Sequence, residues 1–167
     1  MESSIYKDNM HTILFVSEPM RAYSIKYKYL PHTAEKAFVA YGSTFSEALE
    51  NAAEAMLGIM LNIRKIGSQK AKDSITIIKQ RAGTKEDLVW YTLQRILEKV
   101  DERGLNAYAF KVKKHAYKKG REEIEGMLFC KQLNEDYSLL EIKAVTPYDL
   151  AVKKSAKGWL IRVVVDV

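Results

Sequence analysis

The stretch "KAFVAYGSTFSEALENAAEAM", residues 36–56, changes its hydrophobic period in the middle, and this change decides the fold. Residues 36–41 alternate between two faces, which is typical of a β-strand. From Phe45 onward apolar residues recur every three or four positions, which predicts an amphipathic helix. Thr44 and Glu47 have the spacing of a capping box, which places the start of that helix. The sequence therefore predicts a strand followed directly by a helix.

The rest of the chain extends this pattern. The first helix is predicted to run over 43–65, and a second helix is predicted between Thr84 and Gly104, a good C-cap residue. Period-two alternation and turn residues predict strands at 73–79, 107–114, 123–133, 141–147, 149–154 and 158–167. Strand, helix, strand, helix and then a run of strands indicates an α+β fold. We expect a mainly antiparallel sheet with two amphipathic helices packed on one face.

Length and composition limit the class of protein. The 167 residues are 47% hydrophobic and 29% charged, as in an ordinary globular protein of one domain. A single cysteine excludes an intramolecular disulfide and fits a reducing compartment. No apolar run approaches the roughly 20 residues of a membrane span, and the apolar run at 11–16 is too short for a signal peptide. We therefore expect a cytoplasmic protein without a membrane partner.

Domain organisation follows from the same reading. We expect one domain over 25–167, preceded by an N-terminal extension over 1–24. The apolar run at 11–16 makes an added strand one interpretation of this extension. A start codon assigned upstream of Met20 is the other.

The basic charge has two interpretations. The chain carries a net charge of +6, and its densest basic stretch is "KVKKHAYKKGR" from Lys111 to Arg121. This stretch is typical of a solvated hairpin tip, because exposed loops are usually charged. It is also compatible with a surface that contacts RNA.

Few residues are available for chemistry. No His/Cys spacing suits zinc, and no glycine-rich nucleotide-binding motif or G-x-S-x-G motif occurs. The acids Glu35 and Asp166 and the carboxylate of Val167 remain. If the first and last strands are neighbours, these oxygens converge and suit a hard cation such as Ca²⁺ or Mg²⁺. The alternative is that both acids are solvated strand ends.

The motifs at both ends of the chain resemble those of the archease family. "HTAE" at 32–35, "EIKAVT" at 141–146 and "VVVDV" at 163–167 correspond to that family's H-T-A-D, K-A-V-T and V-V-D-V patterns. The resemblance covers about Tyr27 to Val167. It implies a small accessory protein of tRNA splicing that activates an RtcB-type RNA ligase. Such proteins promote the ligase–guanylate intermediate and multiple turnover and are not themselves the ligase.

The resemblance also implies site residues. It implies a divalent metal, usually calcium with Mg²⁺ or Mn²⁺ as alternatives, held by Glu35, Asp166 and Val167. His32 and Thr33 would orient Glu35 by hydrogen bonds or face the ligase. The chain departs from the family in carrying glutamate at Glu35 in place of aspartate.

Glu141 and Lys143 also match the family pattern. They alternate along a strand and so share one face, from which they reach the ligase or form a surface ion pair with each other. After "KAVT" the chain reads Pro147-Tyr148-Asp149, which removes a histidine that is usual in the family.

Two other functions stay open at this point. One is a small binding or regulatory module of the same fold for an unrelated partner or ligand. The other is direct RNA binding, whereas the family resemblance implies contact with RNA only through the ligase.

Overall fold

The computed structural model describes residues 23–32 and 34–167, so the strand predicted at 11–16 lies outside the described residues. The elements in chain order are β1 (Tyr27–Leu30), β2 (Lys36–Gly42), α2 (Phe45–Met60), α3 (Ile63–Ser68), β3 (Asp73–Ala82), α4 (Lys85–Arg103), β4 (Asn106–Lys118), β5 (Arg121–Lys131), β6 (Ala144–Ser155) and β7 (Gly158–Asp166). None of the helices in these two ranges is long and apolar enough to cross a membrane.

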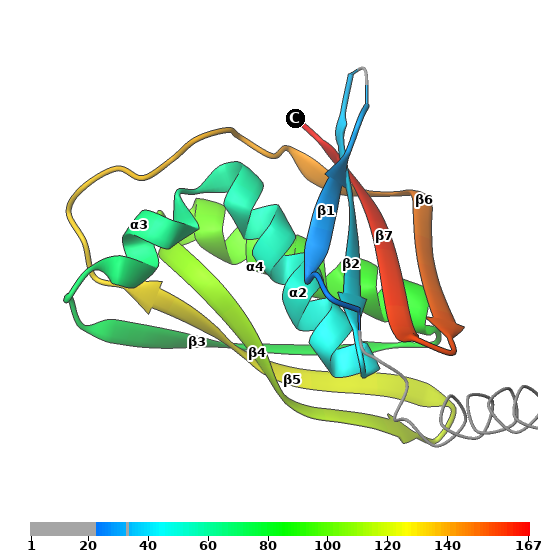
Figure 1. The fold of residues 1–167 in the computed structure, drawn as a ribbon. Coiled ribbons are helices and arrows are strands. Elements are labelled where there is room, and N and C mark those ends of the chain that lie inside the picture. Colours follow the sequence, from blue (N-terminus) through cyan, green and yellow to red (C-terminus); the bar gives the residue numbers. More distant parts are fainter. Residues whose placement is uncertain (1–22, 33) are drawn as a thin grey trace, which may run out of the picture.

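The strands form two antiparallel sheets (Figure 1). One has four strands in the order β1-β2-β7-β6, and the other has three in the order β3-β5-β4. The α+β class and the antiparallel pairing predicted from the sequence are confirmed. The prediction did not anticipate the division into two sheets, with α2 and α4 between them. α2 packs on β2 and β4, and α4 packs on β3 and β6, so each helix covers one face of both sheets.

Local capping explains where the first helix begins and ends. The Thr44 side chain accepts a hydrogen bond from the Glu47 backbone, and the Glu47 carboxylate accepts one in return from the Ser43 backbone at 2.8 Å. The predicted helix over 43–65 ends earlier, at Met60. The backbone is extended at the next residue, and Asn62 then caps the separate short helix α3.

The second helix lies where the sequence predicts it. Thr84 caps the start of α4 by accepting from the Asp87 backbone at 3.1 Å. Gly104 ends the helix in the left-handed conformation, with φ at 57°, where a residue with a side chain would be strained.

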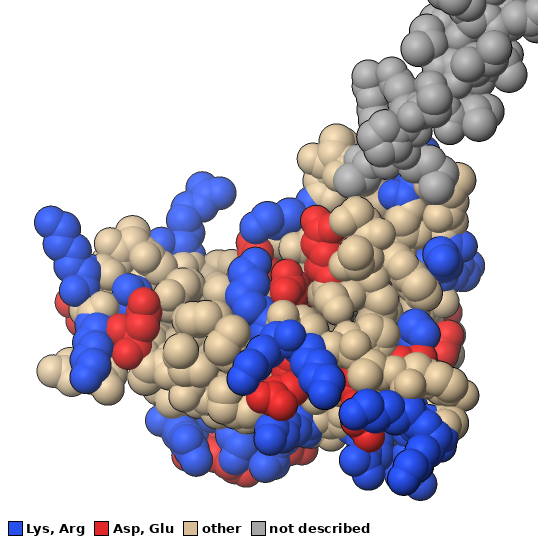
Figure 2. All heavy atoms as spheres, turned by 90° about the horizontal axis from the view of Figure 1, so that it is seen from below, with Lys and Arg blue, Asp and Glu red and all other residues tan. Residues whose placement is uncertain are grey.

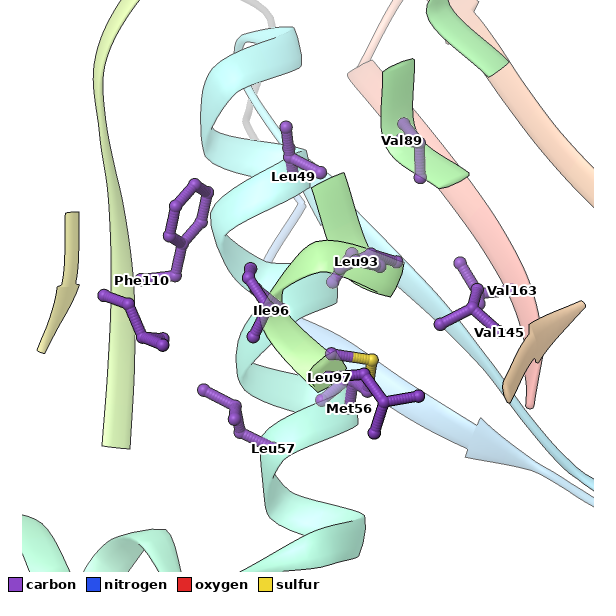
Figure 3. Close-up of a cluster of buried hydrophobic side chains, with 14 of the residues drawn as sticks. Leu49, Met56, Leu57, Val89, Leu93, Ile96, Leu97, Phe110, Val145 and Val163 are labelled. Carbon is purple, nitrogen blue, oxygen red and sulfur yellow. The ribbon is translucent and has the colours of Figure 1, made fainter. Parts of the chain in front are cut away.

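The core lies between the two sheets (Figure 3). Side chains from α2, α4, β4, β6 and β7 meet there without solvent exposure or nearly so, and Figure 3 labels Leu49, Met56, Leu57, Val89, Leu93, Ile96, Leu97, Phe110, Val145 and Val163. Each such side chain contributes about 1.5–3 kcal/mol to stability through its burial. Asn51 of α2 also donates a buried hydrogen bond of 2.7 Å to the Tyr41 carbonyl of β2. The core therefore holds the central strands β2 and β7 in a fixed position.

Candidate functional site

The central strands of the four-stranded sheet bring two acids to one end of the molecule. In the antiparallel register of β2 and β7, Lys36 lies opposite Val165. Glu35 directly precedes β2, and Asp166 is the last residue of β7. The two acids therefore lie one step beyond the same pair of residues. Figure 1 shows the C-terminus beside the loop that joins β1 to β2.

The loop between β1 and β2 carries the predicted His-Thr-Ala-Glu motif. Pro31 follows the last residue of β1, and because proline has no backbone N–H it cannot continue the ladder of hydrogen bonds. His32 Nε2 lies 3.7 Å from Glu35 Oε2, and both side chains are partly exposed. This separation is too long for a hydrogen bond but places the imidazole beside the carboxylate. Thr33 lies outside the described residues.

The last residue of the chain is fixed by packing. The Val167 side chain is partly buried and packs against the hydrophobic core, and Asp166 is also partly buried. The packing of this side chain keeps the last residue at the end of β7, directly after Asp166. The structure therefore brings Glu35, Asp166 and Val167 to the same end of the sheet.

The segment just before β6 contacts this end through its backbone. The Lys143 backbone donates a hydrogen bond of 2.7 Å to the Asp166 carbonyl. The next-but-one residue, Val145, is held by α4, because the Trp90 indole donates to its carbonyl at 2.8 Å and the Gln94 side chain accepts from its N–H at 3.0 Å. The backbone of Lys143 is thus held beside the end of β7 by this hydrogen bond and by the helix contacts of Val145.

Glu141 lies near a different group of acids. Burial raises the pKa of Asp101 at the end of α4, and the charge of Glu141 raises it further. Both acids line a cavity of about 520 Å³ together with Glu135 and Asp136. Glu141 and Lys143 are both exposed on either side of buried Ile142, but they lie in the segment before β6 and not in a strand, so the predicted strand at 141–147 begins later, at Ala144. Within the described part of the chain they form no ion pair with each other.

The side-chain oxygens at the strand ends are of the type that binds a hard cation. They are carboxylate oxygens only, which Ca²⁺ and Mg²⁺ prefer. Neither Glu35 nor Asp166 pairs with a lysine or arginine in residues 23–32 and 34–167. In those same ranges, no three histidine, cysteine, aspartate or glutamate side chains gather into a group able to hold a metal ion.

A buried ionic cluster between the two sheets was not predicted from the sequence. Glu122 of β5 is almost fully buried and accepts hydrogen bonds from Lys85 of α4 and from His115 Nε2 of β4, the latter at 2.7 Å. Burial alone would raise the pKa of Glu122, but these two partners lower it below its usual value. The Phe45 and Trp159 rings lie 5.7 and 5.6 Å from the Lys85 ammonium. The cluster joins α4 to the three-stranded sheet. In the part of the chain that the structure describes, its residues form no hydrogen bond or ion pair with Glu35 or Asp166.

Comparison with known families points to one group of proteins. Residues 27–167 match the model of the family described as the Archease protein family (MTH1598/TM1083). A protein archease of Methanosarcina acetivorans is 33% identical over 144 residues, which cover 85% of this chain and 96% of the relative. A protein archease of Pyrococcus furiosus is 28% identical over 145 residues, covering 85% of this chain and 99% of the relative.

Solved structures show the same fold. The solution structure of Methanobacterium thermoautotrophicum protein 1598 superposes with a TM-score of 0.73 at 24% identity, covering 85% of this chain and 99% of that one. The crystal structure of a Thermotoga maritima archease, described as a possible chaperone, gives a TM-score of 0.50 at 18% identity, covering 84% and 96% of the two chains.

Proposed function

Because this chain belongs to the archease family, we propose that it is an accessory factor of tRNA splicing that activates an RtcB-type RNA ligase. In this proposal the protein promotes guanylylation of the ligase and multiple turnover, and the ligase itself joins the RNA ends. The full sequence supports this division of roles, because it contains no nucleotide-binding glycine motif and no recognisable nucleophile motif.

The observation that carries the proposal is the meeting of the two terminal motifs. The "HTAE" loop precedes β2 and the "VVVDV" motif forms the end of β7, and these strands are hydrogen-bonded neighbours. Residues separated by most of the sequence thus form one end of the molecule. Archease-type motifs that were scattered over the sheet would give no common surface for a ligase.

We also propose that a divalent cation, Ca²⁺ with Mg²⁺ or Mn²⁺ as alternatives, binds to Glu35, Asp166 and the Val167 carboxylate. A bound cation would offset the repulsion among these carboxylates and leave coordination positions for a ligand from the partner. His32 lies beside Glu35 and so limits the positions that this longer acid can take. Lys143, whose backbone N–H is bonded to the Asp166 carbonyl, is proposed to face the ligase from the segment before β6.

We propose that this activity takes place in the cytoplasm. The one cysteine of the chain, Cys130, is buried and free, as is common in a reducing compartment.

Formation of the ligase–guanylate intermediate tests the proposal directly. The cognate RtcB-type ligase is incubated with labelled GTP and divalent metal, with and without this protein, and the labelled ligase is quantified. We expect faster and more complete labelling when the protein is present, and no labelling of this protein by itself. Equal labelling of the ligase in both reactions would show that the proposed function is wrong.

A further inference from the structure

The outer face of the three-stranded sheet, turned away from the helices, has a basic end that the site above does not use. Figure 2 views this side of the molecule and shows lysine and arginine side chains massed over it with fewer acids between them. Seven basic residues lie around the end formed by the β4–β5 turn, namely Lys79, Arg81, Lys113, Lys114, Lys118, Lys119 and Arg121. We call them the basic end of the sheet.

This end contains most of the net charge of the chain. Among the described residues, Glu123 and Glu125 are the acids that line its grooves, and they pair with Arg81, Lys79 and Lys113 at 2.9, 3.8 and 3.6 Å. The excess is five positive charges, compared with +6 for the whole chain. The remaining four basic residues form no ion pair with any acid of the described residues, namely Lys114, Lys118, Lys119 and Arg121.

The basic end is hollowed rather than flat. One groove of about 450 Å³ is lined by Lys79, Arg81 and Lys114 with the two glutamates, and a second of about 430 Å³ is lined by Arg81, Lys118, Lys119 and Arg121 with Glu123. They share Arg81 and Glu123, so they are continuous along the sheet. The four residue steps from Glu125 to Arg121 give this groove a length of roughly 13 Å.

The turn itself keeps a lysine in an unusual conformation. Lys119 and Gly120 both have positive φ values, 50° and 75°, as a two-residue hairpin turn requires. Asparagine, aspartate or glycine is favoured at the first of these positions. A lysine there adds a charge at the mouth of the groove at some cost in backbone strain.

The other half of the same face carries four apolar residues between the basic end and the ion pair of Asp73 with Lys131. Ile75 and Ile77 of β3 are 52% and 48% exposed, and they lie opposite the partly exposed Phe129 and Met127 of β5. One face of the sheet thus offers a basic groove and, directly along the strands, an apolar surface.

We propose that this face binds single-stranded RNA, with backbone phosphates in the basic groove and bases against the apolar half. Single-stranded RNA presents phosphates and apolar base faces side by side, whereas a duplex keeps its base faces stacked inside. An acidic protein surface would complement the charge of the groove, but its acidic groups would not pack against the apolar half. The charge and its apolar neighbour therefore favour RNA as the occupant.

The test is fluorescence anisotropy with a short labelled single-stranded oligoribonucleotide and the full chain, without ligase, over a range of salt concentrations. We expect affinity to fall with salt, because phosphate contacts release counterions. The variant Lys118→Gln/Arg121→Gln should bind roughly tenfold more weakly, and its slope of log Kd against log salt should be smaller by about 1.4, since each phosphate contact contributes about 0.7.

A matched control removes the same charge elsewhere. Lys70→Gln/Lys72→Gln takes two exposed lysines from the segment just before β3, away from the β4–β5 turn, and should bind like the unchanged protein. Ile75→Ser/Ile77→Ser should weaken binding without changing the salt slope. Equal losses in the Lys118/Arg121 and control variants, no binding at all, or a duplex of the same sequence binding as tightly would each overturn the proposal.

The outcome is separable from that of the guanylylation assay, which contains no RNA. If the protein binds RNA but does not stimulate guanylylation, the RNA proposal is supported and the ligase proposal is wrong. If it stimulates guanylylation but does not bind RNA, the ligase proposal is supported and the RNA proposal is wrong. If the Lys118/Arg121 change weakens capture of the ligase in the absence of RNA and leaves the affinity for the oligoribonucleotide unchanged, the groove is a protein interface and the RNA proposal is wrong.

Discussion

Lys36 of β2 lies directly opposite Val165 of β7, and this single pairing brings the two ends of the archease motif set together. The residue before Lys36 is Glu35, and the residue after Val165 is Asp166. A slip of one residue in this register would turn the side chains of one strand to the other face of the sheet. The buried packing of β2 and β7 on the core prevents such a slip, so the position of the two acids follows from the fold.

The two acids should contribute to metal binding without supporting the core. We expect Asp166→Ala and Glu35→Ala to lower the affinity for Ca²⁺ by about tenfold or more, since each removes a carboxylate ligand. Isothermal titration calorimetry with Ca²⁺ measures this. Both variants should have a free energy of unfolding within about 0.5 kcal/mol of that of the unchanged protein, because neither acid is a core residue.

The control for these variants is Glu86→Ala, which removes an exposed acid from the first turn of α4. It should bind Ca²⁺ as the unchanged protein does. If Glu86→Ala and Asp166→Ala have the same affinity, the acids at the strand ends are solvated and hold no metal.

The terminal carboxylate can be tested by moving a tag. A peptide tag after Val167 converts its carboxylate to an amide and should weaken Ca²⁺ binding, whereas the same tag before Met1 should not. Calorimetric titration of the two tagged proteins gives the comparison. Equal affinities would exclude Val167 as a ligand.

The buried cluster at Glu122 predicts a pH-dependent stability. Its folded-state pKa is lowered, so its contribution is present above the unfolded glutamate pKa of about 4.3 and is lost as the pH falls through the folded value. We expect Glu122→Gln to cost about 1–3 kcal/mol at pH 7, because Lys85 and His115 lose a charged acceptor. The cost should shrink as the pH falls below the unfolded pKa of about 4.3 and through the lowered folded value, since the carboxylate itself then becomes protonated.

Urea unfolding followed by circular dichroism at pH 7 and at acid pH measures this difference. Glu123→Gln on the same strand is the matched control, since its ion pair with Arg81 is at the surface and worth at most about 1 kcal/mol. A Glu122→Gln cost that is equal at both pH values would show that the charge of the carboxylate is not what stabilises the cluster.

Cys130 should report on the integrity of the three-stranded sheet. Burial raises the pKa of its thiol to about 11, and the side chain is almost fully inaccessible. Because only the thiolate reacts, we expect very slow modification by a disulfide reagent at pH 8 and rapid modification in urea. Immediate reaction of the native protein would contradict the buried position of β5 in this fold.

Elements with local determinants could be predicted from the sequence. Thr44, Thr84 and Gly104 act within one turn of the helix that they cap, so the two starts and one end were predictable. The early end at Met60 was not, because the periodicity continues through Ile63. There the extended backbone and the cap at Asn62 override the apolar spacing.

Features that depend on distant pairing could not be predicted. Alternation indicates strands but not their partners, so the sequence did not separate the antiparallel strands into two sheets. Glu122 faces inward by the regular alternation of β5, on the same face as Ile124 and Leu128, but the sequence could not show that Lys85 of α4 and His115 of β4 would meet it there. The meeting of Glu35 with Asp166 was predicted only on the condition that their strands are neighbours, which the register of β2 and β7 fulfils.

The most direct test of the ligase proposal is multiple-turnover ligation. The cognate RtcB-type ligase joins RNA ends in the presence of GTP and divalent metal, with this protein added in substoichiometric amount as the unchanged chain, Asp166→Ala, Glu35→Asp or Glu86→Ala. We predict many turnovers with the unchanged chain, with Glu35→Asp and with Glu86→Ala. With Asp166→Ala we predict few turnovers, as with ligase alone. Full stimulation by Asp166→Ala would contradict the account, because the end of the sheet formed by β2 and β7 would then not be what the ligase uses.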